Sequence, residues 1–135
     1  MPFVIDCSVT MAWIFPDEAT EITNGLRESL ESDLAVVPSL WPIEVGNVLL
    51  AATRSGRISV RDWKRVESNL AALPIEVDPE TSEQMWRATM PLAFKHKLST
   101  YDATYLELAA RLKLPLATLD KELRAACNAA KVEVL

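Results

Sequence analysis

The sequence predicts an α/β fold in which helices cover both faces of a parallel sheet. Short apolar runs alternate with longer segments of helical periodicity. Most of the short runs are apolar at nearly every position, as expected for strands that are buried on both faces. The chain has 135 residues and 50% hydrophobic content, which suits one core and leaves little room for a second. We therefore expect a single domain over residues 1–135, built as a three-layer sandwich.

Five runs are candidate strands because they are short, apolar and separated by helical segments. They lie at Phe3–Asp6, Ala35–Pro38, Ile75–Val77, Leu116–Thr118 and Val132–Leu135. Parallel sheets of this kind bind ligands at the carboxyl ends of their strands. Polar residues that follow these strands are therefore the first candidates for a functional site.

Apolar periodicity and capping residues predict the helices between these strands. A strongly apolar helix starts at Ser39 or Pro42 and ends near Arg54. Pro91 is expected to kink or split the helix that Asp78 and Pro79 open. The remaining helices are predicted within 17–32, 59–73, 99–112 and 120–130.

Composition excludes several classes of protein. The net charge of −5 argues against a protein that coats nucleic acid by bulk electrostatics, but it is compatible with acids that hold divalent cations. With one histidine, His96, a histidine-based metal site or a Ser-His-Asp triad is not expected. Cys7 and Cys127 are read as reduced core thiols of a cytoplasmic protein. We find no apolar run long enough for a membrane span and no signal-peptide pattern.

Four acids are candidate metal ligands. Asp6 ends the first predicted strand, and Asp120 follows the strand that ends at Thr118, so both belong at the same edge of the sheet. Asp102 lies in the first turn of its helix, and Glu44 lies in a helix with almost no polar face. Oxygen ligands without histidine or cysteine suit Mg²⁺ or Mn²⁺.

Each acid also has a purely structural interpretation. Asp6 and Asp120 each stand where a helix N-cap is expected, Asp102 fits a capping box with Ser99, and Glu44 can be an ordinary exposed glutamate. The two roles are compatible, because one carboxylate oxygen can cap a helix while the other holds a metal. Two carboxylates about 4 Å apart repel by roughly 4 kcal/mol at an effective dielectric constant near 20. A convergent cluster would therefore take up a proton or bind a cation.

Four stretches of the sequence resemble the PIN-domain family, and within it the ribonuclease toxins of VapBC-type toxin–antitoxin pairs. They are "VIDCSV", "WPIEVGNVLL", "LSTYDATYLELA" and "LATLDKEL", in the family's order across almost the whole chain. In the second stretch, Pro42, Glu44 and Asn47 have the family's Pro-x-Glu-x-x-Asn spacing. The resemblance implies a five-stranded parallel sheet flanked by helices, with acids clustered at one edge.

The resemblance also implies roles for individual residues. The acids Asp6, Glu44, Asp102 and Asp120 match the family's catalytic, metal-binding positions, and the supporting polar positions fall on Asn47, Thr118 and Ser8. The implied activity is cleavage of RNA by water that Mg²⁺ or Mn²⁺ activates. Some members have a further Asp after the last of these acids. Here only Glu122 is nearby, which weakens the case for a second metal.

Partners follow from the same resemblance and from the cationic residues. The family implies a cognate antitoxin and a homodimer. A complex with the antitoxin can extend this homodimer to a higher assembly. Arg54 shares a narrow polar stripe with Glu44 and Asn47, and Lys97 shortly precedes Asp102, so both are candidates for binding RNA phosphates.

Two alternatives remain open at this point. A phospho-receiver domain also has strand-end acids and binds Mg²⁺. Asp78 would be its phosphate acceptor, but the strand that ends at Thr118 is followed by Leu119 and Asp120 where a receiver has lysine. The second alternative is a non-catalytic binding module on the same fold.

Overall fold

A parallel sheet forms the centre of the molecule, as the sequence predicts. The computed structural model describes all 135 residues. Its strands have the order β3-β2-β1-β4, and every neighbouring pair is parallel. They are β1 (Phe3–Ile5), β2 (Ala35–Pro38), β3 (Ile75–Asp78) and β4 (Leu116–Ala117). The residues of β1, β2 and β4 are all buried, which explains why these strands are apolar at nearly every position.

The prediction of a fifth strand over Val132–Leu135 is wrong. This segment makes only an isolated parallel bridge, between Val134 and Leu116. The N–H of Leu116 donates to the carbonyl of Glu133 (2.9 Å), and the N–H of Leu135 donates to the carbonyl of Leu116 (3.0 Å). These two hydrogen bonds do not extend into a regular strand pairing, because β4 is only 2 residues long. The strand ends at Ala117, and the next helix begins at Lys121, so few residues of this strand can pair with the C-terminal segment.

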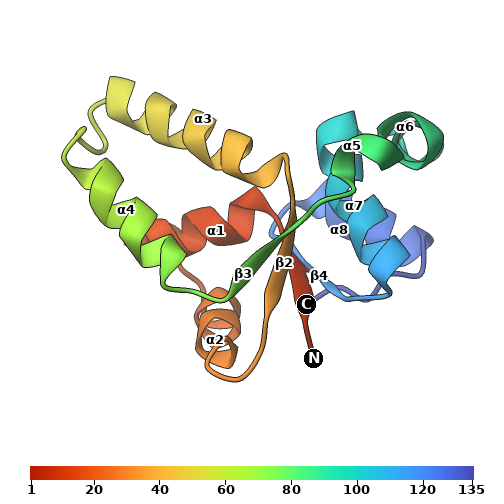
Figure 1. Ribbon diagram of the computed structural model, residues 1–135, viewed down its shortest axis with the longest axis horizontal. Coiled ribbons are helices and arrows are strands. Elements are labelled where there is room, and N and C mark those ends of the chain that lie inside the picture. Colours follow the sequence, from red (N-terminus) through yellow and green to blue (C-terminus); the bar gives the residue numbers. More distant parts are fainter.

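Helices cover both faces of the sheet (Figure 1). On one side lie α1 (Cys7–Ile14), α2 (Glu21–Ser29), α3 (Trp41–Arg54) and α4 (Asp62–Ala71), with a short 3₁₀ turn, η1 (Pro16–Glu18), after α1. On the other side lie α5 (Thr81–Gln84), α6 (Met90–His96), α7 (Thr100–Leu112) and α8 (Lys121–Ala129). The three-layer arrangement is therefore confirmed. None of these helices combines the length and the apolar character that crossing a bilayer requires.

The predicted break near Pro91 is confirmed. A π-helical turn, η2 (Met85–Thr89), joins α5 to α6, and Pro91 lies in the first turn of α6. Proline has no N–H for the i→i−4 hydrogen bond, and its ring crowds the preceding turn. The wider π turn just before it accommodates this change in the helix.

Helix α7 is the central helix of the fold. It packs against β1, β2 and β4, and its residues from Ala103 to Ala109 are all buried. Near its C-terminal end, Arg111 forms ion pairs with the buried carboxylates of Asp78 at the end of β3 and Glu107 one turn earlier, both at 2.7 Å. Removing one partner of such a buried pair costs about 3–5 kcal/mol, because the other charge is left without a counter-ion. The ion pair with Asp78 therefore ties α7 to the end of β3.

Helix α3 is much less buried than its apolar sequence predicts. Only Trp41, Val45 and Ala52 of its residues are buried, whereas Ile43 is 69% exposed and Leu50 is 38% exposed. Its apolar side chains face α4 across an open groove instead of a packed interface. The apolar surplus of α3 is therefore available at the surface.

Candidate functional site

Asp6 is the most deeply buried of the predicted site acids. It lies between β1 and α1, and its Oδ1 accepts hydrogen bonds from the N–H of Val9 (3.1 Å), which caps α1, and from the hydroxyl of Ser8 (2.6 Å). Its Oδ2 accepts the hydroxyl of Thr118. Burial raises the pKa of Asp6, and the hydrogen bonds from Ser8, Thr118 and Val9 oppose that rise. The side chain is thus held in one position by both of its oxygens.

Asp120 lies at the neighbouring strand end. It is the N-cap of α8, and its Oδ1 accepts the N–H of Leu123 (2.9 Å). The hydroxyl of Thr118 accepts the N–H of Asp120 (3.1 Å), and the hydroxyl of Ser8 accepts the N–H of Leu119 (2.9 Å). The hydroxyls of Ser8 and Thr118 therefore join the carboxyl ends of β1 and β4 and bring Asp6 and Asp120 to one edge of the sheet.

Glu44 and Asp102 come from helices on opposite sides of the sheet. Oε1 of Glu44, on α3, accepts the hydroxyl of Tyr105, on α7, at 2.6 Å. Asp102 lies in the first turn of α7, and its N–H donates to the hydroxyl of the N-cap, Ser99 (3.1 Å). Its own carboxylate accepts no hydrogen bond from the protein, so both oxygens are available to a ligand.

Electrostatics link the four acids. The pKa of Asp102 is raised to about 6, first by burial and then by the negative charges of Asp120, Glu44, Asp6 and Glu122. The charges of the other three predicted acids therefore reach Asp102. As the side chains stand, however, no three acidic, histidine or cysteine side chains are close enough together to be ligands of one ion.

The other predicted site residues differ in whether they contact the acids. Asn47 is exposed and makes no hydrogen bond to Glu44. Arg54, at the C-terminal end of α3, and Lys97, just after α6, are exposed and form no ion pair. Ser8 and Thr118 are the predicted supporting residues that contact an acid directly.

Tyr105 donates a hydrogen bond to one of the site acids, Glu44, and was not among the predicted residues. Its side chain is 1% exposed, and burial together with the bond to Glu44 raises the pKa of its hydroxyl far above the usual range. The signal in the sequence is its position three residues after Asp102, which places both on one face of α7. Without the structure, such a tyrosine is read as an ordinary core residue.

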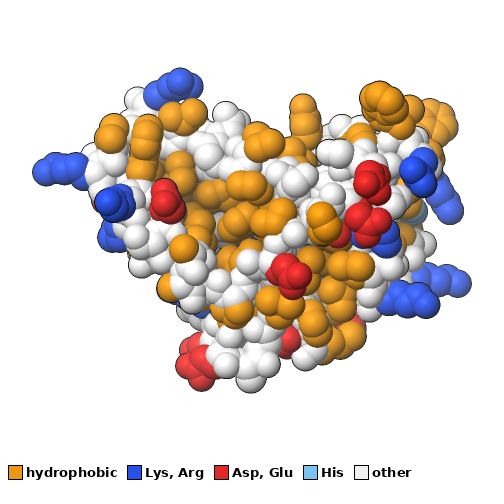
Figure 2. All heavy atoms as spheres, in the orientation of Figure 1, with side chains coloured by type: hydrophobic (Ala, Val, Ile, Leu, Met, Phe, Trp, Pro, Cys, Tyr) orange, Lys and Arg blue, Asp and Glu red, His pale blue; other side chains and the backbone are white.

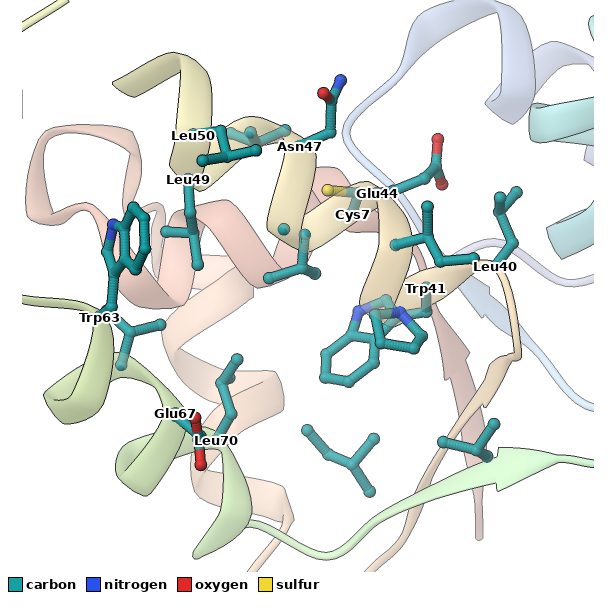
Figure 3. A pocket seen from close by; sticks show the side chains of 18 of the residues that line it. Cys7, Leu40, Trp41, Glu44, Asn47, Leu49, Leu50, Trp63, Glu67 and Leu70 are labelled. Atoms are coloured by element: carbon teal, nitrogen blue, oxygen red, sulfur yellow. The ribbon is translucent and has the colours of Figure 1, made fainter. Parts of the chain in front are cut away.

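A large apolar groove opens next to the acids, between α3 and α4. Its volume is about 1310 Å³, and 16 of its 21 lining residues are hydrophobic. Hydrophobic side chains gather in the hollow between the two helices (Figure 2). Figure 3 shows Trp63 and Leu70 on the α4 side and Leu49 on the α3 side, whereas Glu44 and Asn47 lie at the rim. The groove thus reaches the acidic site at Glu44.

The sequence and the fold both match known proteins. The PIN domain family matches residues 3–129. Ribonuclease VapC1 of Mycobacterium tuberculosis is 34% identical over 107 residues, which cover 75% of this chain and 74% of that protein. Ribonuclease VapC3 of Pyrobaculum aerophilum is 26% identical over 123 residues, which cover 91% and 92% of the two chains.

Solved structures show the same fold. A crystal structure of a Pyrobaculum aerophilum protein superposes with a TM-score of 0.69 at 24% identity, covering 93% of this chain and 84% of that one. VapBC2 of Rickettsia felis, bound to a DNA fragment from its promoter, gives a TM-score of 0.65 at 14% identity, with 100% and 98% coverage. A toxin–antitoxin complex from Klebsiella pneumoniae gives 0.57 at 16% identity, with 87% and 86% coverage. Together with the match over residues 3–129 and the 34% identity to a VapC protein, this agreement shows that the chain belongs to the PIN-domain family, in its VapC branch.

Proposed function

We propose that this chain is a metal-dependent endoribonuclease, the toxin of a toxin–antitoxin pair, and that it acts in the cytoplasm. The observation that carries the proposal is the electrostatic influence of Asp120, Glu44 and Asp6 on Asp102, which adds to burial in raising the pKa of that carboxyl to about 6. The relatives named ribonuclease VapC support the assignment to RNA.

The residues suit Mg²⁺ or Mn²⁺ by their chemistry. All four donors are carboxylates, the ligands that these ions prefer, and each repels the others until a cation is present. No three of these groups are close enough together as they stand, so a shared ion requires a rotation of the unbound Asp102 carboxylate or bridging waters. Asp102 has two oxygens without a protein partner, and Asp120 and Glu44 have one each, so the site has donors to offer.

The proposed roles follow from how each side chain is held. Asp6, fixed by Ser8 and Thr118, is the rigid ligand, and Asp102 and Asp120 complete the site around it. Glu44 approaches from α3 and binds the ion or orients the attacking water. When bound, the ion supplies an activated water and offsets the charge of the phosphodiester during cleavage. Ser8 and Thr118 act through Asp6 by setting its orientation, and Asn47, exposed at the groove rim, is placed to contact a bound water or the substrate.

Arg54 and Lys97 are the proposed contacts to RNA phosphates. Both are exposed and free of ion pairs, whereas Arg57 is engaged by Asp17 and Glu18. Arg54 lies ten residues after Glu44, so about 15 Å separates them along α3, a distance of two to three nucleotides. Such contacts would hold the strand while a phosphate between them is cleaved.

The phospho-receiver alternative loses its support in the structure. Asp78, its required phosphate acceptor, is 7% exposed and is bound by the Arg111 guanidinium. A carboxylate that is buried and ion-paired in this way is a poor acceptor. The non-catalytic alternative is decided by the cleavage assay described below.

We propose that the antitoxin binds in the groove between α3 and α4. The groove is large and apolar, and exposed apolar surfaces of this kind usually mark partners. An apolar segment seated there would cover the rim at Glu44 and block access to the acids. The similarity to structures of toxin–antitoxin assemblies supports a partner of this class.

We propose that a second copy of the chain binds the stripe formed by Trp86, Met90 and Phe94. These side chains are 82%, 53% and 90% exposed and lie four residues apart along η2 and α6. The segment is acidic near its start, at Glu83, and basic near its end, at Lys95. In an antiparallel, two-fold arrangement the apolar stripes pair with each other, and Glu83 lies near the partner's Lys95.

Asp6→Asn is expected to reduce RNA cleavage more than about 100-fold, because it removes a charge from the ion's most rigid ligand. Cleavage of a labelled RNA with added Mg²⁺ or Mn²⁺ measures this effect, and Asp33→Asn, at an acid paired with the N-terminal amine, is the matched control. Undiminished cleavage by Asp6→Asn would remove Asp6 from the mechanism. A wild-type chain that binds the ion but cuts no RNA would establish the non-catalytic module.

Asp102→Asn is expected to stabilise the metal-free protein at neutral pH by about 1 kcal/mol. This value is reduced because Asp102 is partly exposed, and it corresponds to a few degrees in Tm. The folded-state pKa of about 6 lies above the usual 3.8, so the folded protein binds more protons than the unfolded chain between these values. The charge of Asp102 should therefore lower wild-type stability as pH rises from about 4 to about 6, and the variant should lack this contribution. Thermal melts in a chelator measure it. The control is Asp17→Asn. Arg57 lowers the pKa of the Asp17 carboxyl, so this substitution should not stabilise the protein.

Leu50→Glu is expected to weaken antitoxin binding more than 10-fold and to leave RNA cleavage unchanged, because it places a charge in the apolar groove. The antitoxin is to be sought in the small reading frame adjoining the gene, and titration calorimetry with its purified product gives the affinity. Val60→Glu, at a side chain 62% exposed and outside the groove, is the control. Equal inhibition of wild type and Leu50→Glu would place the antitoxin elsewhere.

The double variant Trp86→Glu, Phe94→Glu is expected to be a monomer where the wild type is a dimer, because four like charges would face one another across the stripe. Light scattering after size exclusion measures the mass. Both side chains are largely exposed, so the variant should melt like the wild type. Ile22→Glu, on α2 and 60% exposed, should remain dimeric. A double variant that stays dimeric contradicts this interface.

A further inference from the structure

We propose that Tyr105 is a positioning residue, which holds Glu44 in the orientation needed to bind the divalent cation. The inference rests on the proposed function. It starts from one contact between two helices, in which the Tyr105 hydroxyl on α7 donates to Glu44 Oε1 on α3 at 2.6 Å. No other side-chain hydrogen bond joins α3 to α7. This contact is therefore the polar link between Glu44 and the helix that carries Asp102.

Packing makes Tyr105 a rigid donor. The side chain is 1% exposed and belongs to the main hydrophobic core, so its ring cannot move without disturbing that core. Its hydroxyl is neutral at physiological pH and has a proton to donate. It is thus suited to bind a carboxylate without competing with it for the cation.

Glu44 needs such a donor more than Asp6 and Asp120 do. Asp6 and Asp120 are held by hydrogen bonds at the ends of short side chains, whereas Glu44 has a longer, more flexible side chain. It lies on α3, which is only partly buried, and the charges of Asp102 and Asp6 act in the same site. Without Tyr105, repulsion and side-chain entropy would favour a Glu44 turned out to solvent.

The test compares Tyr105→Phe, which removes only the hydroxyl, with the matched control Tyr101→Phe. Tyr101 is the chain's other tyrosine, it is 61% exposed, and its hydroxyl has no hydrogen-bond partner. Mn²⁺ is titrated into metal-free protein by calorimetry, and RNA cleavage is measured as a function of Mg²⁺ concentration. We expect Tyr105→Phe to bind Mn²⁺ about 10- to 100-fold more weakly and to need correspondingly more Mg²⁺ for half-maximal cleavage. Tyr101→Phe should bind Mn²⁺ like the wild type.

A double-mutant cycle separates positioning from a general structural effect. If Tyr105 acts through Glu44, Tyr105→Phe should have little further effect on Mn²⁺ binding in a Glu44→Gln background. An equal loss in both backgrounds, or wild-type Mn²⁺ affinity in Tyr105→Phe, would overturn the proposal. If Tyr105→Phe does not fold, as judged by circular dichroism, Glu44→Asp replaces it, because the shorter acid keeps the charge but cannot reach the hydroxyl. Wild-type Mn²⁺ affinity in Glu44→Asp would then overturn the proposal.

The two readouts also separate this inference from the proposed function. A wild type that binds Mn²⁺ but cleaves no RNA contradicts the ribonuclease assignment, and the calorimetric comparison still decides the role of Tyr105. A wild type that binds no Mn²⁺ contradicts both.

Discussion

The buried carboxylate of Asp6 is the point on which the site depends. Its oxygens accept hydrogen bonds from Ser8, Val9 and Thr118, and these bonds cap α1 and join the ends of β1 and β4. A buried carboxylate without such donors would take up a proton or disrupt the fold. The structural role and the proposed catalytic role are therefore served by the same atoms, because the bonds that satisfy Asp6 also hold it at the edge of the sheet where Asp120 lies.

The acids at this edge make the fold less stable, and other contacts offset that cost. Asp102 is partly buried near four other acids, and both burial and their charges disfavour its charged form. The same helix, α7, is secured further along by its buried residues and by the ion pairs of Arg111 with Asp78 and Glu107. A rigid central helix can thus hold a carboxylate in an unfavourable place. Functional sites often combine local destabilisation with a rigid scaffold in this way.

Two apolar surfaces lie on opposite sides of the sheet. The groove between α3 and α4 reaches the acids at Glu44, and the stripe on η2 and α6 projects from the other layer. This separation allows an antitoxin and a second copy of the chain to bind the same molecule without competing. It also explains a composition that is 50% hydrophobic in a small acidic protein, since part of the apolar content is not used in the core.

Local chemistry in the sequence was sufficient to predict much of the fold. Apolar runs marked the four observed strands, Ser99 and Asp120 marked the starts of α7 and α8, and Pro91 marked the break before α6. These features depend on neighbours within a few residues, which a sequence displays directly. The same reasoning named the four acids, because strand ends and helix starts can be located along the chain.

Only the tertiary structure decided the rest, because it depends on residues far apart in the chain. The fifth strand was reduced to one bridge by the shortness of β4. The apolar face of α3 became the wall of an open groove because α4 stands apart from it. Tyr105 reaches Glu44 across 61 positions of sequence, and no local pattern distinguishes that hydroxyl from one in an ordinary core.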